Sequence, residues 1–285
     1  MSAATACYWK LYGVPLSQPF RSVAWALLQN HVRFDVQLIV PGATTVKIGS
    51  LTESYQSKSR MRTTRIPLLE DTRTGFTVAE SPAILSFLCE YYGWNALYGP
   101  PGSAKKATID SYMHWHHTGT RTLARLAFPY FRPESNLPVN TDKDRARTFQ
   151  MLETLETGWF SSLNHDNGDD WFLAGGTSPS IADLLAYEEV VQLPMLGLIP
   201  DDILQQKYPK IGAWTHRMRQ LPYHNEVHVA LATLGDVTKT IDDDQPVSKR
   251  LGAATKAGLQ ALAQVQKDFG DDESSVAHPP PVSKL

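Results

Sequence analysis

The chain has 285 residues, of which 42% are hydrophobic and 20% are charged, and its formal net charge is −2 at pH 7. This length allows one large domain or two ordinary ones, with enough apolar residues for real cores. The near-neutral charge gives no indication of bulk attraction to nucleic acid or to a membrane surface. The two cysteines, Cys7 and Cys89, are too few for a disulfide framework or a zinc site.

The first ten residues (MSAATACYWK) lack a charged region followed by an apolar one, so we expect no signal peptide. No apolar run reaches the length of a transmembrane helix. We therefore expect a soluble protein of a reducing compartment.

Residues 8–93 alternate between strand and helix patterns. Phe34, Val36 and Leu38 alternate with polar residues, which is typical of a half-buried strand, whereas the apolar residues after Pro19 recur at helical spacing. Ser81 is expected to cap the helix that Pro82 opens and Gly93 ends. The predicted order is a strand at 11–14, a helix from 19 to about 30, a strand at 33–38, an irregular loop with short helical turns at 41–59, strands at 65–70 and 76–78, and a helix from 81 to 92.

After the Gly/Pro-rich linker at 94–103, the apolar residues recur only at helical spacing. One predicted helix opens at Ser180, where Asp183 forms a short-acid variant of the capping box. The other predicted helices span about 105–128, 141–164, 209–220, 223–234 and, with a weak pattern, 247–269. We therefore divide the chain into a domain at 8–93, a linker at 94–103, a helical domain at 104–240 and an extension at 241–285 whose end has the composition of a disordered tail.

Three short motifs in the first domain suggest a binding site. Ser17 lies at the mouth of a predicted helix, where backbone N–H groups and the helix dipole favour an anion. The Ile66–Pro67 strand start can present backbone groups to an extended peptide, and Glu80–Ser81 can hold an ammonium group beside a carboxylate. Each motif also has an ordinary interpretation: a turn serine, an edge-strand proline and a capped helix with a nearby acid.

Together the three motifs, including LSQPFR at 16–21, resemble the glutathione site of theta-class glutathione transferases. SIADLLAY at 180–187 resembles the capping motif of their helical domain, and the resemblance covers residues 8 to about 234. It implies an α/β thioredoxin-like N-terminal domain followed by an all-α C-terminal domain. The implied reaction is conjugation of glutathione to an electrophilic small molecule, with reduction of organic peroxides as a second activity. Glutathione would be a substrate, so no metal or other cofactor is implied. Because family relatives are homodimers, the resemblance also implies a homodimer.

The resemblance also implies roles for individual residues. The Ser17 hydroxyl would stabilise the glutathione thiolate; no Ser/His/Asp arrangement surrounds it, so we expect a hydrogen-bond donor and not a nucleophile. The implied glutathione-binding residues are Lys47 and Arg65 at the glycyl carboxylate, Ile66 at the cysteinyl backbone, and Glu80 and Ser81 at the γ-glutamyl end. Val46 departs from the family pattern, which commonly has histidine there.

An apolar pocket for the electrophile is expected beside Ser17. Its candidate residues are Trp115, Arg121, Leu126 and Tyr130, with Arg121 matching a helix arginine between the two subsites of the family. The nearby His114, His116 and His117 invite a metal interpretation, but consecutive helix residues do not face one point. We expect packing and surface roles for them.

Two alternatives to an enzyme stay open: a carrier of apolar ligands on the same fold, and a dimerisation module whose working part is the C-terminal tail. The last three residues, Ser283, Lys284 and Leu285, match a peroxisomal address. A peroxisomal location with an import receptor as partner is therefore expected, with the cytoplasm as the alternative.

Overall fold

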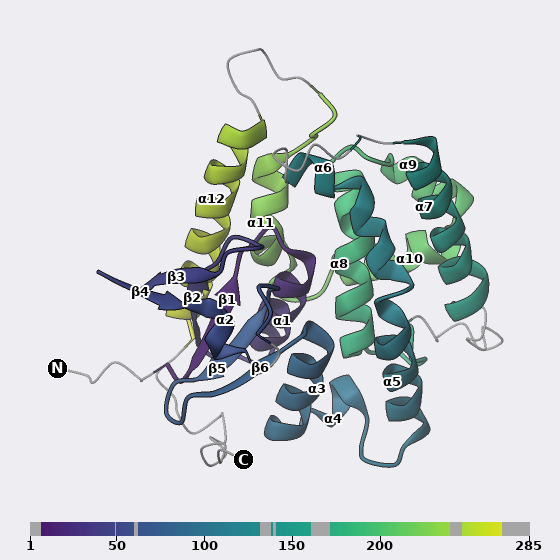
Figure 1. Ribbon diagram of the computed structural model, residues 1–285. Coiled ribbons are helices and arrows are strands. Elements are labelled where there is room, and N and C mark those ends of the chain that lie inside the picture. Colours follow the sequence, from purple (N-terminus) through teal and green to yellow (C-terminus); the bar gives the residue numbers. More distant parts are fainter. Residues whose placement is uncertain are drawn as a thin grey trace.

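The computed structural model describes residues 7–48, 50–59, 62–131, 138, 141–160, 172–239 and 247–269. A small sheet with its helices lies on one side of the molecule and a group of helices on the other (Figure 1). Ser283, Lys284 and Leu285 lie outside the described residues, so the peroxisomal address stays a prediction. In the part of the chain described here, no helix is both long and apolar enough to cross a membrane.

The N-terminal domain is built on a mixed four-stranded sheet with the strand order β2-β1-β5-β6. β1 runs parallel to β2 and antiparallel to β5, and β5 runs antiparallel to β6. This arrangement confirms the predicted thioredoxin-like order. The elements are β1 (Trp9–Gly13), α1 (Gln18–Gln29), β2 (Phe34–Leu38), β3 (Thr45–Ile48), β4 (Leu51–Ser54), α2 (Tyr55–Lys58), β5 (Leu68–Asp71), β6 (Phe76–Ala79) and α3 (Ser81–Tyr92).

The two faces of the sheet are covered differently. Leu11 and Leu69 belong to the main core, which also contains the buried faces of α1 and α3. Tyr12 and Leu68, the next residues along the same strands, point to the opposite face because side chains alternate along a strand. There they form a small second core with Tyr55 and two further buried residues, Ile39 and Val46.

The segment 41–59 is more regular than the sequence suggested. The prediction of an irregular loop was wrong at 45–54, where β3 and β4 form an antiparallel hairpin. Among the hairpin residues whose burial the structure describes, only Val46 is buried, with 3% of its surface exposed, so the period-two pattern that marks a half-buried strand is too short to see. The short helical turn expected in this segment is present as α2.

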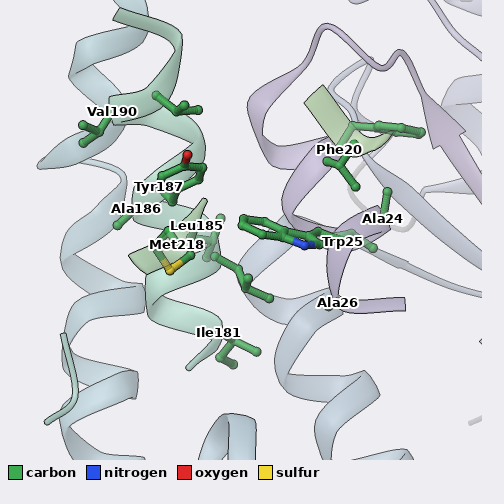
Figure 2. Close-up of a cluster of buried hydrophobic side chains, with 14 of the residues drawn as sticks. Phe20, Ala24, Trp25, Ala26, Ile181, Leu185, Ala186, Tyr187, Val190 and Met218 are labelled. Atoms are coloured by element: carbon green, nitrogen blue, oxygen red, sulfur yellow. The ribbon is translucent and has the colours of Figure 1, made fainter. Parts of the chain in front are cut away.

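The C-terminal domain consists of helices around the buried helix α8. The elements are α4 (Asn95–Tyr98), α5 (Ala104–His116), the 3₁₀ helix η1 (Thr120–Leu126), α6 (Phe128–Phe131), α7 (Asp142–Thr154), the π-helix η3 (Leu155–Trp159), α8 (Ile181–Met195), α9 (Asp201–Lys207), α10 (Pro209–Met218), α11 (His224–Leu234) and α12 (Val247–Lys267). Every residue of α8 from Ile181 to Leu193 is buried. The Trp25 ring on α1 lies 5.6 Å from the Tyr187 ring on α8, so the two domains share one core (Figure 2).

The expected helix over 105–128 is broken. α5 ends at His116, and a 3₁₀ helix follows Gly119. A Cβ atom at Gly119 would lie 2.5 Å from the Trp115 ring, so only glycine fits at this position beside the ring. The helix predicted over 141–164 is α-helical only to Thr154, and its residues after 160 lie outside the described part. The predicted linker at 94–103 contains α4, and α9 was not predicted.

The weak pattern at 247–269 is a real helix, and it packs on the folded body. α12 lies along α11 (Figure 1). A Cβ atom at Gly258 would be 2.7 Å from the ring of Pro15, which precedes the Ser17 turn. Near the C-terminal end of α12, Gln266 Oε1 accepts a hydrogen bond of 2.7 Å from the Phe34 amide on the edge strand β2.

Candidate functional site

Three predicted motifs converge at one end of the sheet, where β1 and β6 end and β5 begins. The register pairs Tyr12 with Leu68, and Leu68 with Ala79. The residues just beyond these positions are the turn that leads to Ser17, the cis Ile66–Pro67 bond, and Glu80. Segments far apart in the sequence are therefore neighbours in space, as the resemblance required.

Ser17 is the residue that precedes α1, and its hydroxyl is available to a ligand. Its backbone amide donates to the Val14 carbonyl at 2.9 Å, and its carbonyl accepts from the Arg21 amide at 3.0 Å. The half-buried side chain makes no cap hydrogen bond, although it stands at the N-cap position. An anion here would face the N-terminal end of a 12-residue helix and a free hydroxyl donor.

The start of α3 differs from the expected cap. Ser81 is the first helical residue and not the N-cap, and no side-chain cap hydrogen bond is present. The preceding Glu80 has φ 72° and ψ 118°, a conformation that costs a non-glycine residue of the order of 1–3 kcal/mol. Strain of this kind is concentrated at ligand sites. Glu80 Oε2 lies 3.8 Å from His117 Nε2 of the helical domain, so this motif is at the boundary between the domains.

The candidate residues for the glycyl end lie on the rim. Lys47 and Arg65 are both exposed, on β3 and before β5. Their backbones are anchored: the Lys47 carbonyl accepts from Gln37 Nε2 at 3.2 Å, and the Arg65 carbonyl accepts from the Tyr55 hydroxyl at 2.9 Å. Val46, the departure from the family pattern, is buried in the second core and presents no polar group to a ligand.

Arg121 links the helical domain to the residue after Ser17. Its Nη1 atom donates to Glu189 Oε1 at 2.7 Å and to Gln18 Oε1 at 3.1 Å. Burial raises the pKa of Glu189 to about 6, although the Arg121 charge works in the opposite direction. The sequence interpretation missed Gln18 and Glu189; the one available signal was a pair of adjacent glutamates among mostly apolar residues at 181–195.

The four candidate pocket residues differ in what they can offer a ligand. Leu126 is fully buried in the core and has no exposed surface. Trp115 is half-buried, and its ring lies 5.5 Å from the Trp159 ring. Arg121 and Tyr130 are also half-buried. A cavity of about 450 Å³ lies away from these residues, on one face of α11 beside Met195.

The three neighbouring histidines do not act together. His116 is buried and its Nδ1 atom lies 2.9 Å from Thr120 Oγ1, whereas His114 and His117 are exposed. Among the described residues, no group of three His, Cys, Asp or Glu side chains could hold a metal ion.

Known proteins resemble both the sequence and the fold. Residues 122–222 match the family model described as "Glutathione S-transferase, C-terminal domain". The chain is 28% identical over 261 residues to glutathione S-transferase T1 of Arabidopsis thaliana, covering 88% of this chain and 98% of that protein. It is 31% identical to T2 of the same plant, covering 78% of this chain but only 36% of that protein. A dichloromethane dehalogenase of Methylophilus leisingeri is 26% identical, with 92% of this chain and 95% of that protein covered.

Solved structures give the same result for the architecture. Human glutathione S-transferase T1-1 in its apo form superposes with a TM-score of 0.63 at 23% identity, covering 89% of this chain and 99% of that chain. Human glutathione transferase theta-2 superposes with a TM-score of 0.62 at 20% identity, covering 92% of this chain and 100% of that chain. The chain therefore has the glutathione transferase fold: a thioredoxin-like domain with a mixed sheet, followed by a mostly helical domain. Over most of its length its sequence is similar to theta-class glutathione S-transferases.

Proposed function

We propose that the protein is a glutathione transferase of theta-like type, which conjugates glutathione to an electrophilic small molecule. The observation that carries the proposal is the Ser17 hydroxyl, which makes no cap hydrogen bond at the start of α1, at the end of the sheet that also holds Ile66 and Glu80. The similarity to glutathione S-transferases over 88% of the chain supports the same activity.

Each end of glutathione has a matching group in the proposal. The γ-glutamyl end carries an ammonium and a carboxylate on one carbon, which suit the Glu80 carboxylate and the N-terminal end of α3. The cysteinyl backbone pairs with Ile66, and the glycyl carboxylate lies toward the exposed cations Lys47 and Arg65. The thiol then lies at Ser17. A carrier that only binds apolar ligands would not need this set of groups.

The chemistry requires an ionised thiol. A free cysteine thiol has a pKa of about 8.5, so most of it is protonated at neutral pH. Donation by the Ser17 hydroxyl and the α1 dipole favour the thiolate, and the released proton goes to solvent. The sulfur lone pair forms a bond to the electrophilic carbon while the bond from that carbon to its leaving group breaks. For an alkyl halide the leaving group is the halide ion, and no oxidant or reductant is consumed.

Small halogenated alkanes are the electrophiles that we would test first. The support is the similarity to a protein named dichloromethane dehalogenase over 92% of this chain. The half-buried Trp115 and Tyr130 offer apolar surface for such a substrate. Organic peroxides are a second substrate class for the same thiolate.

The decisive experiment titrates the thiol of bound glutathione by its ultraviolet absorbance in wild type and Ser17→Ala. A hydrogen bond to a charged group contributes about 1.5–3 kcal/mol, so the pKa of the bound thiol should rise by about 1–2 units in the variant. Ser103→Ala is the matched control, because Ser103 accepts from the Lys106 amide and caps α5 away from the site. An unchanged thiol titration in Ser17→Ala would contradict the role of the Ser17 hydroxyl in stabilising the thiolate.

Glutathione recognition is tested separately at Glu80. Glu80→Gln keeps the size of the side chain but removes the charge proposed to bind the ammonium group. We expect at least a tenfold higher dissociation constant for glutathione by calorimetry, and a dissociation constant unchanged from wild type for thiols that lack the γ-glutamyl group. Equal weakening for both ligands would contradict the assignment.

A further inference from the structure

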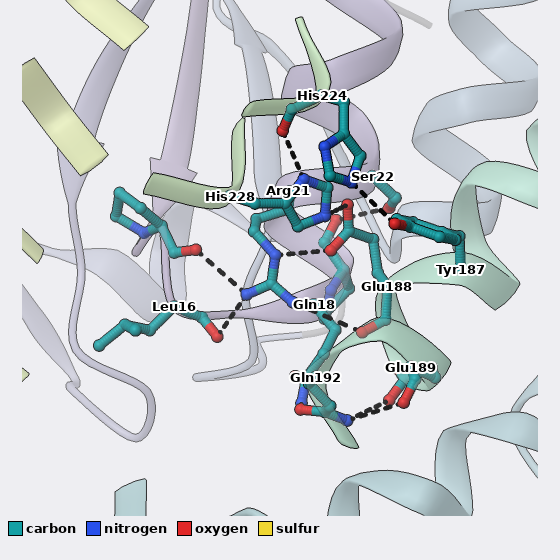
Figure 3. A network of polar contacts seen from close by, with 12 residues as sticks. Leu16, Gln18, Arg21, Ser22, Tyr187, Glu188, Glu189, Gln192, His224 and His228 are labelled. Carbon is teal, nitrogen blue, oxygen red and sulfur yellow. Dashed lines mark hydrogen bonds and ion pairs between the residues drawn. The ribbon is translucent and has the colours of Figure 1, made fainter. Parts of the chain in front are cut away.

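The turn that carries Ser17 is held by the side chain of Arg21, one helical turn further along α1 (Figure 3). Arg21 Nη1 donates to the carbonyls of Pro15 at 3.2 Å and Leu16 at 2.9 Å. These are the two residues directly before Ser17. The guanidinium therefore fixes the backbone on one side of the serine, while the Arg21 amide bonds the serine carbonyl on the other.

Arg21 is itself held by the helical domain. Its Nε atom donates to Glu188 Oε2 on α8 at 2.5 Å, and the two side chains are 1% and 0% exposed. The Ser17 turn is thus connected through the buried Arg21 to the central helix of the other domain. The Trp25–Tyr187 ring contact packs the same two helices together beside this ion pair.

A third residue, His228 on α11, completes the group. Its Nδ1 atom lies 2.6 Å from the His224 carbonyl, which can only accept, so Nδ1 carries a hydrogen. Its Nε2 atom lies 3.1 Å from Glu188 Oε1, so the imidazole packs against the carboxylate that holds Arg21. Although burial raises the pKa of Glu188, the neighbouring Arg21 charge lowers it overall, so Glu188 faces Arg21 as a carboxylate.

A buried ion pair is an expensive way to join two helices. Removing ions from water costs several kcal/mol each, and apolar side chains of the same volume often give equal or greater stability. The Arg21 group therefore needs a reason besides stability. Its direct contacts with the two carbonyls before Ser17 supply that reason.

We propose that Arg21 is a positioning residue for the Ser17 hydroxyl, with Glu188 and His228 holding the guanidinium in place. This inference rests on the proposed function. A donor that stabilises a thiolate must be aimed at the sulfur, and a misplacement of about 1 Å can lower a rate about a hundredfold. Because the Ser17 side chain makes no cap hydrogen bond, its direction depends on the backbone that Arg21 fixes.

The test uses Glu188→Gln, which keeps an acceptor oxygen for Arg21 but removes the charge that fixes it, together with Arg21→Met. Arg219→Met is the matched control, because Arg219 Nη2 pairs with Asp201 Oδ1 at 2.8 Å between α9 and α10, away from the turn. For each full-length variant we would measure urea unfolding, glutathione affinity by calorimetry, the thiol titration of bound glutathione, and turnover of an alkyl halide.

For Glu188→Gln we expect at least a tenfold lower kcat and a bound thiol that titrates at higher pH, with glutathione affinity changed less than threefold. Arg219→Met should keep the wild-type titration and kcat. Glu188→Gln with wild-type kcat and titration, and only lower stability, would show a purely structural group and overturn the inference, even if Arg21→Met fails to fold. A wild type whose bound thiol titrates like free glutathione would overturn the proposed function as well, which distinguishes the two failures.

Discussion

Proton uptake by His116 should weaken the fold below neutral pH. The side chain is 1% exposed, and its ring nitrogen Nδ1 is bonded to Thr120. Burial, together with the nearby charges of Arg121 and His117, lowers the pKa of His116 from 6.5 to about 3. The folded state thus keeps His116 neutral where the unfolded chain protonates it. This contribution to stability is fully present above pH 6.5 and is lost as the pH falls toward 3.

The size of the effect follows from the difference in pKa. Each pH unit below 6.5 removes about 1.4 kcal/mol from the free energy of unfolding, so pH 5 removes about 2 kcal/mol. Glu189 acts in the opposite direction between pH 4.5 and 6, because burial raises its pKa and the folded state takes up a proton first. The His116 contribution must therefore be measured as a difference between variants.

The assay is urea unfolding of wild type and His116→Asn at pH 8 and pH 5. Asparagine can keep the hydrogen bond to Thr120 but cannot take up the proton. Between the two pH values wild type should lose about 2 kcal/mol more than His116→Asn. His114→Asn, which changes an exposed histidine of the same helix, serves as the matched control and should follow wild type. Equal losses in all three proteins would refute the reasoning.

Two further predictions concern packing and capping. Gly258→Ala would place a Cβ atom 2.7 Å from the Pro15 ring and should destabilise the protein by about 1–3 kcal/mol in urea unfolding. Gly252→Ala on the same helix is the control, because a Cβ atom there has nothing within 4 Å; this change should be neutral or stabilise the protein by up to about 1 kcal/mol. Equal effects of the two changes would contradict the contact. Asp183 accepts hydrogen bonds from the start of α8, a backbone amide and an indole, so Asp183→Ala should cost about 3–5 kcal/mol, and a loss below 1 kcal/mol would be inconsistent with that network.

The sequence predicted the elements whose signals are local. The strand and helix around Ser17, the hairpin of β5 and β6, and the Ser180–Asp183 capping box each depend on neighbouring residues, and the structure contains all of them. The β3–β4 hairpin and the break at Gly119 were missed. The hairpin has one buried residue, Val46, among those whose burial is described, and the break depends on the position of one ring, Trp115, which no periodic pattern reveals.

The candidate site divides in the same way. Ser17, Ile66 and Glu80 lie in recognisable short motifs, so their convergence at one end of the sheet could be expected. The contact of Arg21 with Glu188 joins residues 167 positions apart, and both side chains are buried where sequence patterns predict apolar groups. A charged residue in the core looks like an interruption of a helix pattern until its partner is known.

The position of α12 bears on how the chain is made. The Phe34 amide and its partner Gln266 are 232 residues apart, so a ribosome working at about 5–20 residues per second delivers the partner roughly 12–46 s after the strand. During that interval the edge strand of the nascent N-terminal domain lacks the hydrogen bond from α12, and the Ser17 turn lacks the contact of α12 with Pro15. Edges of this kind recruit other strands, so the growing chain is most exposed to wrong association just before its last helix emerges.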